Sequence, residues 1–212
     1  MRRICLTIMG VGLLLGGVPI ALAESGDKAA QAFDLATCKA PITIGANDSA
    51  LRDAFNRARG SVRLVFLIDP ICSNCLRGLA DIDKALLSHH DSNRSLRTIV
   101  VHVPVIGAKQ ADTANTCKLV HNRYVKHYWD PSGDTGRVFS KGLGLKDRKG
   151  AAVYAWDVWL VYGADAEWVG VKPPQPDLLM HHLHNLEGYP RLNAARFADE
   201  VEKRLKTKVG TP

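Results

Sequence analysis

Two cysteines, Cys72 and Cys75, are the residues of this chain best suited to carry chemistry. The segment Cys72-Ser73-Asn74-Cys75 separates two thiols by two residues, a spacing that favours a local redox or metal-binding pair over a structural disulfide. A thiolate attacks a disulfide sulfur, and a second thiol close behind it can resolve the mixed disulfide that forms. The motif therefore predicts thiol–disulfide exchange, with Cys72 as the nucleophile and Cys75 as the resolving thiol.

The residues on either side of the motif predict a strand before it and a helix after it. Residues 61–68 form a short apolar, β-branched run that ends at Asp69-Pro70, as expected of a buried strand. Apolar residues then recur at helical spacing, namely Leu76, Leu79, Ile82, Leu86 and Leu87. The first N–H groups of a helix are unpaired and its dipole is positive there, so a thiolate at Cys72 would be stabilised and its pKa lowered.

The first 23 residues predict a secretory signal peptide. Arg2 and Arg3 supply the positive start, residues 11–20 are almost wholly apolar, and Ala21-Leu22-Ala23 resembles a cleavage site before Glu24. The alternative is a retained anchor, but the apolar stretch is shorter than the roughly 20 residues needed to span a bilayer. We therefore expect an exported protein, periplasmic or otherwise extracytoplasmic, with no stable membrane insertion after cleavage.

Composition and charge describe an ordinary folded domain. The chain has 212 residues, 28 of them basic and 21 acidic, and 46% are apolar, which suits one globular domain and excludes disorder and coiled coil. Loss of the signal would lower the charge to about +5. Basic residues do not cluster with aromatic ones, so we expect no nucleic-acid partner. The expected partners are protein thiols or disulfides and a redox partner protein, with no cofactor and no metal.

Export also changes how the other cysteines are interpreted, because disulfides persist in oxidising compartments. Cys5 would leave with the signal, and the motif accounts for two of the remaining four. Cys38 and Cys117 then form a possible second disulfide. The alternative is that both are unpaired buried thiols.

The strand, motif and helix from Val62 to Leu87 resemble the thioredoxin superfamily, in particular its exported thioredoxin-like and peroxiredoxin-like thiol:disulfide oxidoreductases. The resemblance extends over roughly residues 50–205. It implies an α/β, thioredoxin-like three-layer fold with a central mixed sheet and helices on both faces. The further elements expected are strands over 96–103, 123–129 and 158–162, a last strand over 167–169 that closes a hairpin, and helices over 110–120, around 138–143 and over 196–205.

The predicted signal peptide and the resemblance together divide the chain into four parts. Residues 1–23 are the signal peptide and 24–60 an N-terminal extension that contains one helix over 49–58. Residues 61–206 form the thioredoxin-like domain, and 207–212 a C-terminal tail.

The chain departs from the family pattern opposite the motif. Thioredoxin-like enzymes usually place a cis-proline just before the strand that faces the cysteines, but the stretch from Tyr154 to Val158 contains no proline. The way in which the family docks its substrates is therefore not expected of this chain. The alignment instead puts Trp156 or Asp157 near the dithiol, where a carboxylate would raise thiol pKa values or accept a proton from Cys75. The alternative is that Asp157 only ends a loop.

Two other classes of function remain open. Asp130-Pro131-x-x-Asp134-Thr135 is similar to a motif of Sco-type copper proteins, which would make this a redoxin-fold copper-handling protein. Sco-type proteins, however, place three residues between their cysteines. The third hypothesis is a non-catalytic thioredoxin-fold binding module whose C-x-x-C is a structural disulfide.

The histidines at 181, 182 and 184 offer imidazoles to a metal. Three histidines on one short segment do not normally converge on a single ion without other ligands. We therefore predict that His181, His182 and His184 form a surface patch.

Overall fold

The computed structural model describes residues 40–45, 49–90, 92–120 and 123–209. The chain divides into two units, residues 1–34 and 35–212, and all the described residues belong to the second. The predicted signal peptide and Cys38 lie outside the described residues. Among the helices described here, none has both the length and the apolar character needed to cross a membrane.

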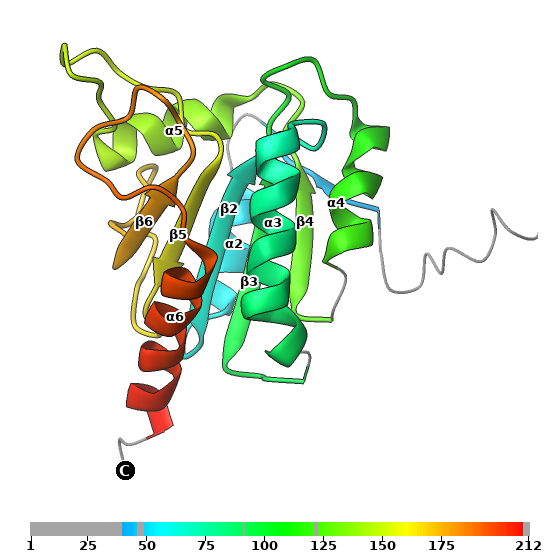
Figure 1. Cartoon of the computed structure of the whole chain (residues 1–212), viewed down its shortest axis with the longest axis vertical. Helices are drawn as coiled ribbons and strands as arrows, with labels where there is room; N and C mark the ends of the chain where they lie inside the picture. The colour runs from blue at the N-terminus through cyan, green and yellow to red at the C-terminus, as the bar shows by residue number, and fades with distance from the viewer. Residues whose placement is uncertain (1–39, 46–48, 91, 121–122, 210–212) are drawn as a thin grey trace, which may run out of the picture. The chain divides into compact units, whose positions relative to one another are not determined.

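Six strands form one mixed sheet in the order β1-β4-β3-β2-β5-β6 (Figure 1). The neighbours β1 and β4, β4 and β3, and β3 and β2 are parallel, whereas β5 is antiparallel to both β2 and β6. Their bounds are β1 Ile42–Thr43, β2 Val62–Ile68, β3 Leu96–His102, β4 Val125–Trp129, β5 Val158–Tyr162 and β6 Leu178–His181.

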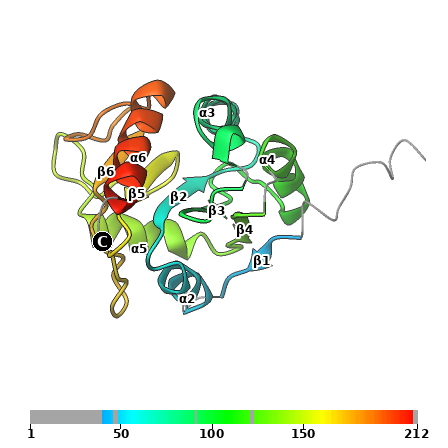
Figure 2. The same ribbon diagram turned by 90° about the horizontal axis from the view of Figure 1, so that it is seen from below.

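Helices cover both faces of this sheet, as Figure 2 shows in the view along its strands. On one face lie α3 (Ser73–Ala85), α4 (Thr113–Leu119) and α6 (Ala194–Val209), and on the other α2 (Ser49–Arg57) and α5 (Asp134–Leu143). Two short 3-10 helices, η1 (Leu87–His90) and η2 (Gln110–Asp112), complete the list. The predicted three-layer α/β arrangement is confirmed.

The central strand β2 is buried on both faces, which explains why its sequence is continuously apolar rather than alternating. Val65 and Leu67 point into the core under α2 and α5, and Phe66 and Ile68 into the core under α3 and α6. This packing holds the end of β2 in one position, and the cysteine motif begins four residues after that end.

The predicted closing hairpin is wrong in its second strand. The partner of β5 is β6, and residues 167–169 are a loop. The backbone groups of Trp168 are taken by a side chain: its N–H donates to Asn56 Oδ1 at 2.9 Å, and Asn56 Nδ2 donates to its carbonyl at 3.0 Å. The indole packs edge-on against Phe55 and Phe139. Residue 168 is therefore held by α2 and cannot also pair with β5.

The region from residue 24 to 60 contributes a strand to the sheet and a helix to the core, whereas its sequence predicted only an extension with one helix. Within residues 24–60, β1 pairs with β4, and α2 buries Leu51, Ala54 and Phe55 in the core. At the other end α6 continues beyond the predicted Leu205 to Val209. The predicted helix over 110–120 is divided into η2 and α4.

Candidate functional site

Cys72 lies at the start of α3, directly after the turn that follows β2. Its N–H donates to the carbonyl of Asp69 at 3.1 Å, and its sulfur accepts from the N–H of Cys75 at 3.4 Å, so Cys72 is the N-cap of the helix. Both cysteines are free thiols. Cys72 keeps 8% of its surface exposed, whereas Cys75 has none. Of the two residues, only Cys72 therefore has surface that a partner molecule can reach.

The two thiols have pKa values shifted in opposite directions. The hydrogen bond from Cys75 is the main cause that lowers the pKa of Cys72 to about 6, and the backbone N–H groups of Cys75 and Asn74 add to it, against burial and the charge of Asp157. The pKa of Cys75 is raised by its hydrogen bond to Cys72, by burial and by Asp157. At neutral pH the accessible sulfur is a thiolate and the buried one a thiol.

Asp69 connects the motif to a second loop at the same edge of the sheet. Its buried carboxylate accepts from the N–H of Ile71 at 3.0 Å and from the N–H of Ile106 at 2.9 Å. Ile71, Val105 and Ile106 are among the most exposed large apolar side chains of the described residues. The entrance to Cys72 therefore has an apolar rim on two loops that one carboxylate holds together.

Asp157, which directly precedes β5, lies beside the two sulfurs. A carboxylate oxygen of Asp157 and the sulfurs of Cys72 and Cys75 all lie within 4.8 Å of one another, and all three residues are buried. No described peptide bond is cis, and Asp157 is the one non-glycine residue among the described ranges with positive φ, at 48°. Such a conformation costs on the order of 1 kcal/mol and is typical of functional sites. Trp156 is partly buried against both cores.

His182 completes the surroundings of this carboxylate. Its Nδ1 lies 3.2 Å from Asp157 Oδ1, its N–H donates to the Asp157 carbonyl at 3.1 Å, and Trp159 Nε1 donates to the same Oδ1 at 3.2 Å. Burial raises the pKa of Asp157, and the contacts with His182 and Trp159 oppose that rise. A Cβ at Gly78 would come within 2.8 Å of Trp159, so a glycine there lets α3 approach these rings.

The predicted histidine patch is therefore wrong for two of its three members. His181 is buried at the end of β6, with Nε2 3.2 Å from the carbonyl of Tyr189. His182 lies at the dithiol, and only His184 is exposed. Successive residues of an extended segment point to opposite sides, which separates His181 from His182. His182 could have been placed at the site only by predicting that the strand before it, β6, pairs with β5.

Two other features of the sequence, Cys117 and the segment that begins at Asp130, are also placed by the structure. Cys117 on α4 is disulfide-bonded, while its predicted partner Cys38 lies outside the described residues. Asp130 uses its carboxylate to accept from the N–H groups of Gly133 at 3.0 Å and Thr135 at 2.7 Å. The segment that is similar to the Sco-type motif thus holds the start of α5.

The strand order and the C-x-x-C motif at the start of the helix after the central strand define a thioredoxin-like fold. No protein-family model matches the sequence, and no curated protein does.

Solved structures with a similar fold include proteins of two kinds. A SCO1/SenC family lipoprotein from Bacillus anthracis is 9% identical, with a TM-score of 0.45 over 70% of this chain and 84% of that chain. A thioredoxin-family thiol:disulfide interchange protein from Chlorobium tepidum is 15% identical, with 0.42 over 70% and 83%. A secreted disulfide oxidoreductase from Mycobacterium tuberculosis is 8% identical, with 0.40 over 69% and 84%.

Proposed function

We propose that this protein is an exported thiol:disulfide oxidoreductase that exchanges disulfides with protein substrates through Cys72 and Cys75. One observation carries the proposal: an accessible sulfur with a pKa of about 6 lies at a helix start, with a buried, protonated thiol one turn behind it. Export rests on the N-terminal sequence, which also puts the substrate in a compartment where disulfides persist.

In the reducing direction the reaction has two exchanges. The Cys72 thiolate attacks one sulfur of the substrate disulfide, so that a mixed disulfide forms and one substrate thiolate leaves. Cys75 then loses its proton and attacks the Cys72 sulfur, and the second substrate thiolate leaves. Two electrons pass to the substrate, and a Cys72–Cys75 disulfide remains. The reverse sequence oxidises a substrate dithiol.

Asp157 is suited to accept the proton of Cys75. Once Cys72 is in a mixed disulfide it is no longer a thiolate, so the hydrogen bond that chiefly raises the pKa of Cys75 is lost. A carboxylate whose own pKa is raised by burial is a better proton acceptor at neutral pH than an ordinary aspartate. The ring of His182, with 22% of its side chain exposed, joins this carboxylate to solvent.

Two variants test the proposal. Cys72→Ser should abolish both reduction of insulin and equilibration with glutathione, because no nucleophile remains. Cys75→Ser should still form a mixed disulfide, detected by mass spectrometry, but should not turn over. Activity retained in Cys72→Ser would remove the proposal. A Cys72–Cys75 disulfide that resists thioredoxin-class reductants would favour the non-catalytic binding module instead.

Copper handling is the second candidate, and the cluster of Cys72, Cys75 and Asp157 within 4.8 Å favours it. Thiolates are the ligands that Cu(I) prefers, whereas a carboxylate suits harder ions. Titration of the reduced protein with Cu(I) distinguishes the two functions. Copper handling would be supported if the protein bound Cu(I) stoichiometrically at micromolar concentrations of the metal and Cys72→Ser abolished that binding.

A further inference from the structure

An extended segment, residues 152–157, leads away from the dithiol along α5. Its odd-numbered side chains are buried and its even-numbered ones are partly or fully exposed. Backbone hydrogen bonds hold it in place: Ala155 donates to Gly136 at 3.2 Å and Val153 to Leu145 at 3.0 Å. An extended chain rises about 3.3 Å per residue, so the five residues from Asp157 back to Ala152 span at most roughly 17 Å.

Two adjoining cavities lie along this segment. Their volumes are about 540 and about 280 Å³, and both are lined by Arg137 and Tyr154. The smaller one is also lined by Pro104 and Val105, which belong to the loop that Asp69 joins to the cysteine motif through Ile106. The two cavities therefore adjoin at Arg137 and Tyr154, and we refer to them together as the groove; the smaller one borders the loop at the rim of the active site.

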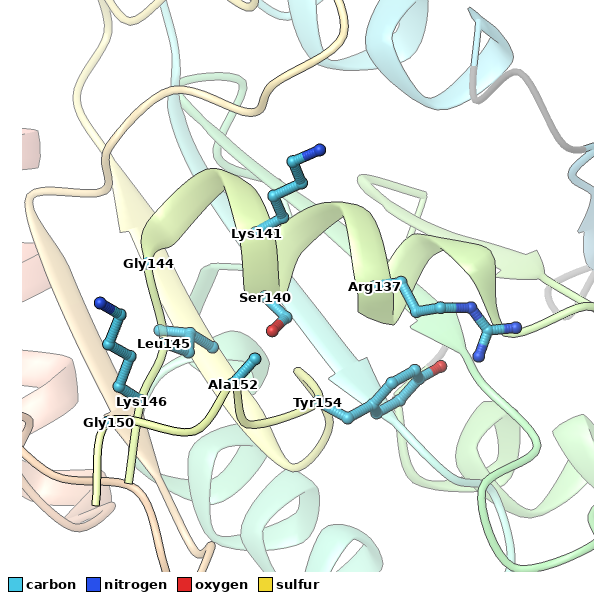
Figure 3. Close-up of a pocket in the computed structure, with 9 residues that line it drawn as sticks. All are labelled: Arg137, Ser140, Lys141, Gly144, Leu145, Lys146, Gly150, Ala152 and Tyr154. Atoms are coloured by element: carbon cyan, nitrogen blue, oxygen red, sulfur yellow. The ribbon is translucent and has the colours of Figure 1, made fainter. Parts of the chain in front are cut away.

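The larger cavity has apolar residues between basic ones, with Arg137 and Lys146 at its two ends and a third basic residue, Lys141, on α5. In Figure 3, Arg137 and Tyr154 lie at one end and Lys146 at the other, with Leu145 and Ala152 between them, while the side chain of Lys141 points away from Ala152 and Tyr154. No acidic residue lines either cavity.

The basic groups at the two ends are available to a ligand. Lys146 makes no ion pair with any residue in the described ranges. Arg137 pairs with Asp134 at 3.2 Å and donates to the carbonyl of Ser132 at 3.1 Å, but its side chain is exposed, so both contacts are weak and exchangeable.

We propose that this groove binds a segment of the protein substrate that carries acidic side chains about three and about five residues from the reacting cysteine, with apolar residues between them. The spacing follows from the segment itself: Tyr154 and Arg137 are about three extended residues from Asp157, and Lys146, which pairs with Ala152, is about five. A guanidinium binds a carboxylate with two parallel hydrogen bonds. The inference rests on the proposed function and names the substrate class of the same site.

Peptide binding tests the inference without any thiol chemistry. The probes are fluorescein-labelled peptides of about ten residues in which serine replaces the reacting cysteine, with glutamates about three and five positions away on one side or the other. Matched peptides carry glutamine at those positions. Two exposed ion pairs correspond to roughly fivefold tighter binding. Fluorescence anisotropy should show that preference for one acidic peptide over its glutamine partner, and high salt should remove it.

The variant R137Q/K146Q should bring the acidic and neutral peptides to within about twofold of each other. The matched control, K84Q/K206Q, removes the same charge from the exposed faces of α3 and α6 and should leave the preference intact. Equal affinity for both peptides, no detectable binding of either acidic peptide, or a preference that survives in R137Q/K146Q would overturn the inference. Insulin reduction by the wild type reports on the proposed function separately, so the two can fail independently.

Discussion

His182 Nδ1 lies 3.2 Å from Asp157 Oδ1, and the backbone N–H of His182 donates to the Asp157 carbonyl at 3.1 Å. Side chain and backbone of one residue thus both hold the aspartate that adjoins the two sulfurs. The remaining exposed part of the ring gives this buried carboxylate a route to solvent.

Asp157→Asn should slow the resolution of the mixed disulfide by a factor of about 100 or more at neutral pH, because the amide cannot accept the Cys75 proton. The pKa of Cys72 should fall further, since Asp157 raises it. Rapid-mixing kinetics measure the first effect, and thiolate absorbance against pH the second. Asp199→Asn on the exposed face of α6 is the control. Unchanged resolution would show that Asp157 is only structural.

His182→Asn removes the ring that lowers the pKa of Asp157. The pKa of Asp157 should then rise, and the pH above which resolution becomes fast should rise with it, because only the ionised carboxylate accepts a proton. The pH profile of single-turnover resolution measures this shift. His184→Asn, two residues along and exposed, is the matched control and should leave the profile in place.

The first exchange should respond to pH through Cys72 alone. Below its pKa of about 6 the nucleophile is a thiol, so the rate with a small neutral disulfide should increase with the thiolate fraction and level off above neutrality. An unperturbed cysteine, with a pKa of about 8.5, would keep gaining rate to about pH 9. Stopped-flow rates from about pH 5 to about pH 9 distinguish the two. A continued increase above pH 8 would contradict the assigned pKa.

Asn56→Ala should lower the free energy of unfolding by about 1–3 kcal/mol, because both backbone groups of Trp168 lose their partner. Asn56→Asp keeps the acceptor for the Trp168 N–H and should cost less. Urea denaturation measures both variants. The pKa of Cys72 should not change in either, since Asn56 lies on α2, on the other face of the sheet from α3; a change would mean that this packing extends to the site.

The local part of the site could be predicted from sequence because it depends on adjacent residues. A buried apolar strand, a turn at Asp69-Pro70 and a helical pattern that begins at Cys72 lie within about 25 residues. Their order determines that a cysteine caps the helix. The N-terminus of a helix has a positive partial charge in any fold, so the lowered pKa of that cysteine could be expected as well.

The strand, the helix and the dithiol between them could therefore be inferred from local sequence. The residues that face the sulfurs depend on contacts between distant parts of the chain. Asp157 and His182 are 25 residues apart and meet because β5 pairs with β6, whereas local pattern had paired β5 with residues 167–169. That choice depended on Asn56, more than 100 residues earlier, whose amide binds the backbone of Trp168. Hydrogen-bond partners so distant in sequence leave no local periodicity from which to infer them.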